Sequence, residues 1–197
     1  LVKYPGLTIV GGLAMAFAIW VGASTFALLS QVTNPTLPLP DGDRIVGITM
    51  WDVSAARPRR QVGHDFVAWR EQVKTIDGIG AFRTLERNLV TPDGRGEPIE
   101  VAEISASAFD VARVRPLMGR TLEAMDEAAG APSVAVIGHD VWKSRFNSDP
   151  AIVGKMIQLG REDATVVGVM PEGYAFPIAQ SVWVPLRLNV LEFARGQ

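Results

Sequence analysis

The chain has 197 residues, of which 48% are hydrophobic, with a formal net charge of −2 and a mean hydropathy of +0.18. This near-neutral charge argues against a dedicated nucleic-acid-binding protein, which usually carries a basic excess. Because the sequence contains no cysteine, disulfides, thiolate metal sites and a cysteine nucleophile are excluded. The length is sufficient for one or two domains with a buried core.

The first segment, residues 7–30, reads LTIVGGLAMAFAIWVGASTFALLS and contains no charged residue and no histidine. As a helix it would be about 36 Å long, against a hydrocarbon core of about 30 Å. The run is longer than the apolar core of a signal peptide. It therefore predicts a transmembrane helix.

Small residues recur within this segment, which leaves two interpretations open. They would allow a second helix to approach closely, as in a helix bundle, or they reflect the ordinary composition of membrane spans. The positions are Gly11, Gly12, Ala14, Ala16, Ala18, Gly22 and Ala23.

Charge and composition predict three parts: a membrane helix with its cytoplasmic flank (1–30), a proline-rich linker (31–43) and an extracytoplasmic domain (44–197). Lys3 precedes the apolar segment, whereas the first charges after it are Asp41, Asp43 and Arg44. The positive-inside rule then places the N-terminus in the cytoplasm and the chain after Ser30 outside.

In the first half of the domain, residue patterns predict a strand, a helix and a hairpin. Residues 44–52 alternate like a strand, and 64–76 have helical spacing, with Asp65 as N-cap and Gly78 as stop. Residues 80–105 predict two strands joined by a turn at 92–94. A basic stretch, residues 54–63, lies between the expected strand and the expected helix. It could contact anionic lipid, but a solvent-exposed loop is the commoner explanation.

The second half predicts further short elements. Ser107 is expected to cap a short helix, and Asp149 followed by Pro150 predicts a helical turn ending at Gly154. The other expected elements are a strand at 133–138, a helix at 139–146, a hairpin with its turn at 160–163, and a strand at 182–186.

Few residues suggest chemistry. His64 and His139 each precede an aspartate, yet neighbours in a helix do not share a face, so capping or surface roles are favoured over a catalytic dyad or half of a zinc site. The acidic residues Glu123, Asp126 and Glu127 lack the donor pattern of a calcium loop, which favours a solvated loop over a Ca²⁺ or Mg²⁺ site.

Catalytic and phosphate-binding motifs are absent from the sequence: it contains no GxSxG, no GxxxxGK[ST] and no GxGxxG after a predicted strand. Trp51, Trp69, Trp142 and Trp183 are expected in the core. The sequence thus predicts a non-enzyme with no catalytic, cofactor-binding or metal residues. A membrane-anchored hydrolase that uses His64 or His139 is the weakest alternative.

Residues 134–177 read VAVIGHDVWKSRFNSDPAIVGKMIQLGREDATVVGVMPEGYAFP. This segment resembles the pattern of MacB-like periplasmic core domains, which is V-V-I-x-x-x-x-W-x-x-R-F-x-x-D-P-x-x-V-G followed by a hairpin with T-V-V-G-V-M-P. The match continues upstream in DFVAWREQ and VAEISASAFDVARVRPLMGRTL. The segment PGLTIVGGLAMAFAIWVGAS is similar to the first transmembrane helix of FtsX-like ABC permeases. The resemblance is strongest to the duplicated orphan type, which has no ATPase domain in the same chain.

This resemblance implies an α+β fold: one N-terminal transmembrane helix, then a mixed α/β extracytoplasmic domain of hairpins and short helices. It implies the bacterial inner (cell) membrane, with residues after about 31 on the periplasmic side. The implied partners are a cytoplasmic ABC ATPase, other permease helices or a second permease copy, and in some systems a periplasmic adaptor.

The family comparison implies that the chain is an N-terminal segment of a permease, with its outer domain incomplete at the C-terminus. The alternative is a single-span membrane-anchored binding or sensor domain without an ATPase.

Overall fold

The computed structural model describes residues 5–33, 39–49, 51–52, 56–58, 63–91 and 94–188. The chain divides into two compact units, Leu1–Leu37 and Pro38–Gln197. Each unit is described by itself.

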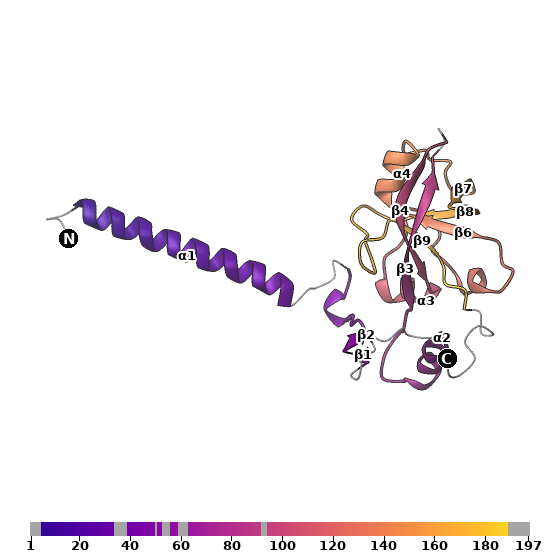
Figure 1. The fold of residues 1–197 in the computed structure, drawn as a ribbon, viewed down its shortest axis with the longest axis horizontal. Coiled ribbons are helices and arrows are strands. Elements are labelled where there is room, and N and C mark those ends of the chain that lie inside the picture. The colour runs from indigo at the N-terminus through magenta and orange to yellow at the C-terminus, as the bar shows by residue number, and fades with distance from the viewer. Residues whose placement is uncertain are drawn as a thin grey trace. The chain divides into compact units, whose positions relative to one another are not determined.

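The first unit is one long helix, α1 (Pro5–Thr33), of 29 residues (Figure 1). Its window Ile9–Phe26 has a mean hydropathy of 1.8, and none of that window is buried. The helix is long and apolar enough to cross a membrane. It covers the predicted segment 7–30. It also includes residues 31–33, which were expected to begin the linker. Residues 34–38 lie outside the described part.

The second unit is built on a seven-stranded mixed sheet in the order β5-β8-β6-β9-β4-β3-β7, and β7 also pairs with β8. Six strands therefore close into a ring, and β5 attaches to it along β8. The strands are β3 (Phe82–Val90), β4 (Gly96–Ile104), β5 (Met118–Gly119), β6 (Val134–Ile137), β7 (Met156–Leu159), β8 (Glu162–Val169) and β9 (Val182–Pro185).

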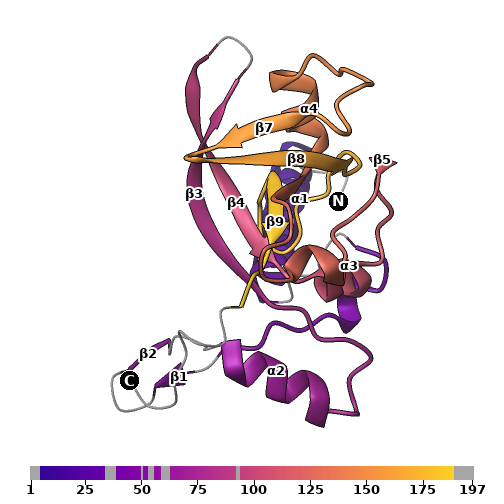
Figure 2. The ribbon, with the colours of Figure 1, turned by 90° about the vertical axis from the view of Figure 1, so that its right-hand side faces the viewer.

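Two parallel pairings, β4 with β9 and β6 with β8, make the sheet mixed; its other pairings are antiparallel. The ribbon of β3 and β4 runs past the shorter strands, as Figures 1 and 2 show. A separate two-stranded sheet joins β1 (Trp51–Asp52) to β2 (Arg57–Pro58).

Apolar side chains on the two faces of the sheet form two core clusters. Along β6, Ala135 and Ile137 belong to one cluster, whereas Val134 and Val136 belong to the other. Because side chains cover both faces of the sheet at β6, all four residues of this strand are apolar, with no alternation of apolar and polar residues. The first cluster packs against α4 (His139–Arg145) and the second contains three residues of α3 (Ala106–Ala112). Figure 2 shows α4 beside β7 and β8, with α3 nearer the other end of the ring.

The remaining helical elements are short. They are η1 (Gly42–Arg44), α2 (Gly63–Gln72) and η2 (Ala124–Glu127).

Two predictions for the first part of the domain are correct only in part. Residues 45–49 have no regular structure, and among the described residues of the expected strand only Trp51–Asp52 pairs with a neighbour. Val46 is 72% exposed, so its apolar side chain has no face of a sheet to cover in the described part of the chain. The helix expected at 64–76 spans Gly63–Gln72, so Asp65 lies inside its first turn and Gly78 lies well past its end.

Of two cap predictions, one is wrong and one is confirmed. The N-cap of α3 is Ser105, while the Ser107 hydroxyl donates to the Ile79 carbonyl at 2.8 Å. The Asp149 carboxylate accepts from the Ala151 N–H at 2.9 Å, as a cap does, and the segment to Gly154 forms turns without a regular helix. Gly154 N–H donates to the Val166 carbonyl on β8 at 2.8 Å. That bond ties the chain to the sheet before a second helical turn can form.

The other elements agree with their predictions. β3 and β4 form the expected hairpin, with Gly94 at φ +79°, while Pro92 and Asp93 lie outside the described residues. The strands β6 and β9, the helix α4 and the β7–β8 hairpin also lie where the sequence placed them. Most of the basic stretch at 54–63 is outside the described part.

The tryptophans agree only in part. Trp183 is fully buried, Trp69 and Trp142 are half-buried, and Trp51 is 58% exposed, which makes its assignment to the core wrong.

Candidate functional site

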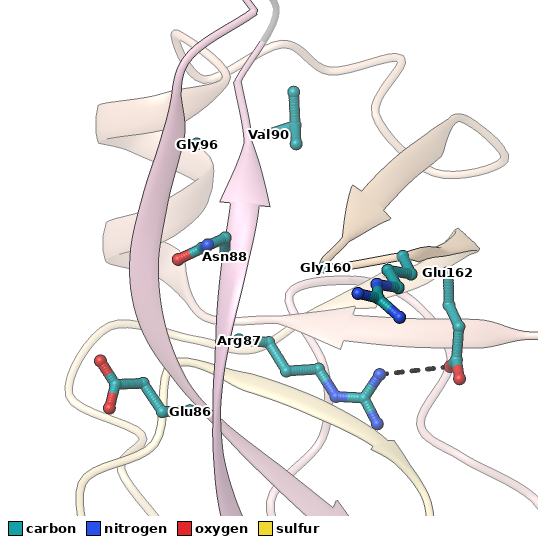
Figure 3. A pocket seen from close by; sticks show the side chains of 8 residues that line it. Glu86, Arg87, Asn88, Val90, Gly96, Gly160 and Glu162 are labelled. Atoms are coloured by element: carbon teal, nitrogen blue, oxygen red, sulfur yellow. Dashed lines mark ion pairs between the residues drawn. The ribbon is translucent and has the colours of Figure 1, made fainter.

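A shallow groove of about 600 Å³ lies between β3 and the turn that joins β7 to β8 (Figure 3). In Figure 3 the Arg87 side chain extends from β3 toward Glu162 of β8. The groove is lined by Glu86, Arg87, Asn88, Val90, Gly96, Gly160, Arg161 and Glu162.

Arg87 connects three strands through its guanidinium group. It lies 3.3 Å from a carboxylate oxygen of Glu162 on β8 and 3.2 Å from one of Glu103 on β4. Glu103 is 7% exposed and also contacts Arg83. A buried carboxylate is costly unless it is paired, so the two arginines explain how β4 accommodates an acid at this position.

The charged side chains that line this groove are Glu86, Arg87, Arg161 and Glu162, of which Arg87 and Glu162 form an ion pair. The lining contains no histidine, serine or threonine. Within the described ranges, no three His, Asp or Glu side chains gather as metal ligands would.

A second groove, of about 660 Å³, lies beyond the end of β3. Lys155 and the Ala151 N–H both donate to the Asp149 carboxylate there, and these bonds lower the Asp149 pKa, the lysine having the larger effect. The lining comprises Val90, Thr91, Phe146, Asn147, Asp149, Ile152, Lys155, Met156, Ile157, Gln158 and Asp163.

The prediction of a solvated acidic loop is correct only in part: Glu123 is exposed, but Asp126 is only 6% exposed. Arg120 donates two hydrogen bonds to its carboxylate, at 2.6 and 3.0 Å, and the Glu123 N–H donates a third at 2.8 Å. The bonds from Arg120 hold the Asp126 pKa below its usual value. In the same loop, Glu127 accepts a bond from the Ala106 N–H at the start of α3.

Arg187 completes this arrangement, which we call the Asp126 clamp (Arg120, Asp126 and Arg187). Its guanidinium donates to the carbonyls of Asp126, Ala131 and Pro132, at 3.3, 2.7 and 2.8 Å. No local sequence pattern predicts the role of Arg187, because its partners lie 55–61 positions away along the chain.

Among the described residues, His139 contacts a neighbouring aspartate and an aromatic ring, and no cluster of metal ligands gathers there. His139 begins α4, with Nδ1 3.7 Å from a carboxylate oxygen of Asp140, whose side chain is 89% exposed. Its ring lies 5.7 Å from that of Trp142. The side chain of His64 is outside the described part, so its role stays a prediction.

The fold of the mixed α/β domain described above is similar to that of outer domains of ABC-type transporters. One solved structure is the extracellular domain of the noncanonic ABC-type transporter YknZ from Gram-positive bacteria, with a TM-score of 0.57 and 20% identity over 76% of this chain and 75% of that one. Another is the periplasmic region of MacB from Actinobacillus actinomycetemcomitans, with a TM-score of 0.52 and 17% identity over 73% of this chain and 64% of that one.

The model of the MacB-like periplasmic core domain family matches residues 6–196. The chain belongs to that family, as its sequence motifs indicated. A comparison with curated proteins finds no match. The family is one of transporter periplasmic domains and is not a known class of enzyme.

Proposed function

We propose that this chain forms the first membrane span and the extracytoplasmic domain of an ABC transporter permease subunit. The carrying observation is the family match, which runs from residue 6 to residue 196 and so includes both the apolar helix and the domain. The likeness of the fold to the outer domains of YknZ and MacB supports the same proposal.

The proposed location is the bacterial inner (cell) membrane, with α1 crossing it and residues after about 31 on the periplasmic side. The length of α1 and the absence of charged residues from it support a span. Lys3 on the N-terminal side supports a cytoplasmic N-terminus.

The proposed role is mechanical: ATP-driven motion passes through the membrane helices and moves the outer domain, which exports or releases a substrate. A closed sheet with two buried clusters suits a domain that moves as one body. The partners in this proposal are a cytoplasmic ABC ATPase, other permease helices or a second permease copy, and a periplasmic adaptor in assemblies that use one. No catalytic, cofactor-binding or metal residue is assigned.

Cysteine labelling tests the location, because the chain contains no cysteine of its own. Asp140→Cys, with a side chain 89% exposed in the native residue, should react in intact spheroplasts with a membrane-impermeant maleimide. Lys3→Cys should react only after the membrane is opened. Labelling of Lys3→Cys from outside would contradict the proposed orientation.

Co-purification tests the transporter role. A tagged form of the native protein, extracted from its own membrane in mild detergent, should carry a nucleotide-binding subunit and hydrolyse Mg-ATP. A protein that purifies without an ATPase, yet is anchored and extracytoplasmic by labelling, would support the alternative of a single-span binding or sensor domain.

A further inference from the structure

The neighbouring strands of the six-stranded ring are paired over very different lengths. β3 pairs with β7 at only two positions, Leu89 with Leu159 and Val90 with Gln158, whereas β3 and β4 are paired from Phe82 to Val90. The join between β6 and β9 is equally short, but all four of its paired residues are fully buried. At the β3–β7 join Val90 is half-buried and Gln158 is exposed, so water reaches the join from outside.

Beyond these two pairs, two polar contacts of the described residues cross the join. Gly160 N–H donates to the Asn88 carbonyl at 2.7 Å, and Arg87 reaches Glu162 at 3.3 Å. Toward the start of β3, the edge that faces away from β4 has no strand partner among the described residues. The groove of Figure 3 lies at this place, which leaves the last contacts of the join beside solvent.

Arg87 can release Glu162 without leaving a buried charge unpaired. The Glu162 side chain is 67% exposed, and ion pairs in such surroundings contribute little. Glu103, the buried acid, keeps its contact with Arg83 when Arg87 moves. The strand β3 meanwhile stays paired with β4 along its whole length.

We infer that the β3–β7 join is a seam at which the ring opens, with β7 leaving β3 while β3–β4 and β6–β8 remain paired. Opening briefly exposes Leu89 and Leu159, which are buried in the first core cluster, so the closed ring predominates. This inference concerns the sheet alone and does not depend on the proposed transport role.

Hydrogen–deuterium exchange of the full chain in detergent tests the seam, because exchange reports local opening. Glu162→Gln should speed the exchange of peptides covering residues 156–161 by roughly two- to fivefold, the range expected for an exposed ion pair. Peptides covering 99–104 and 134–137 should be unaffected. The matched control is Glu86→Gln, which lines the same groove and has no ion-pair partner in the described part of the chain.

A crosslink provides the second arm. Val90 and Gln158 are paired across the seam, and paired residues of antiparallel strands have Cα atoms about 4.5–5.5 Å apart, within disulfide range. Oxidised Val90→Cys/Gln158→Cys should slow exchange at 156–161 relative to its reduced form and should cancel the effect of Glu162→Gln. The seam is wrong if Glu162→Gln leaves exchange at 156–161 unchanged, if it speeds the whole domain equally, or if oxidation has no effect there.

Discussion

Asp126 shows how one buried carboxylate organises a loop that carries no regular secondary structure beyond a short 3-10 turn. Three donors surround it, and the Arg187 side chain fixes the carbonyls on either side of the loop. Exposed ion pairs contribute little, but removing one partner of a buried pair is strongly destabilising. We therefore expect the loss of the Asp126 charge, which leaves Arg120 without its buried charged partner, to destabilise the domain.

Asp126→Asn should lower the free energy of unfolding by about 2–3 kcal/mol at neutral pH, since it removes the charge from hydrogen bonds made to a buried carboxylate. The measurement is urea unfolding of the full chain in detergent, followed by tryptophan fluorescence, to which the buried Trp183 contributes. Asp110→Asn, an exposed position on α3, is the control and should change the value by less than about 0.5 kcal/mol.

The same carboxylate makes stability depend on pH. Because the pKa of Asp126 is lower in the folded protein than its unfolded value of about 3.9, the charged form stabilises the fold above that pH. This contribution is lost as the pH falls through the folded-state pKa. Unfolding measured between pH 7 and pH 3 should show a smaller loss of stability in Asp126→Asn than in the wild type; equal losses would show that other groups govern the acid response.

Gly168 allows β5 to lie against β8. A Cβ at this position would lie 2.0 Å from the Arg120 carbonyl oxygen, a distance at which the backbone must move. Gly168→Ala should destabilise the domain by about 1–3 kcal/mol, as overpacking does. Gly96→Ala is the control, because its Cβ would meet only the Asn88 Cβ at 3.8 Å; thermal unfolding that is equal for the two variants would contradict this packing.

Prediction at the scale of single residues failed where partners are distant in the chain. The partners of Arg187 are at least 55 residues away. The acidic loop resembled a solvated one because no recognisable motif relates Asp126 to its counter-charge, Arg120. The caps were placed by residue type alone, and Ser105 and Ser107 are of the same type. Tertiary hydrogen bonds decide between such residues.

Among the elements, α1 is a helix whose glycines have no packing partner among the described residues of this chain. Gly11, Gly12 and Gly22 have open space around the position of a Cβ within this chain. If the small residues pack against other permease helices, Gly22→Leu should reduce the yield of the co-purified complex while the outer domain stays folded. Val21→Leu, one position around the helix, is the control; an unchanged complex in Gly22→Leu would contradict this packing.

Local patterns predicted the hairpins well, because glycine turns and alternating apolar residues are sufficient to specify them. They failed at residues 44–52, where β-branched and aromatic residues favour a strand but only two residues find a pairing partner among those described. They predicted the Asp149 cap and its short turn correctly, and the bond from Gly154 to β8 ends that turn. At 44–52 long-range pairing, not local preference, decided the structure.

For the whole molecule, the α+β class and the family followed from sequence motifs, whereas the closing of the sheet into a ring did not. Closure depends on β7 meeting β3 more than sixty residues apart in the chain, through Leu89–Leu159 and Val90–Gln158. No short-range pattern encodes such a contact.

The central claim is that nucleotide at a cytoplasmic ATPase moves this domain, and a distance measurement tests it most directly. Spin labels at Lys3→Cys and Asp140→Cys would report the separation of the N-terminal flank and the domain in the purified assembly, by double electron–electron resonance with and without ATP. The account predicts that ATP shifts the distance distribution. Identical distributions in an assembly that hydrolyses ATP would contradict it.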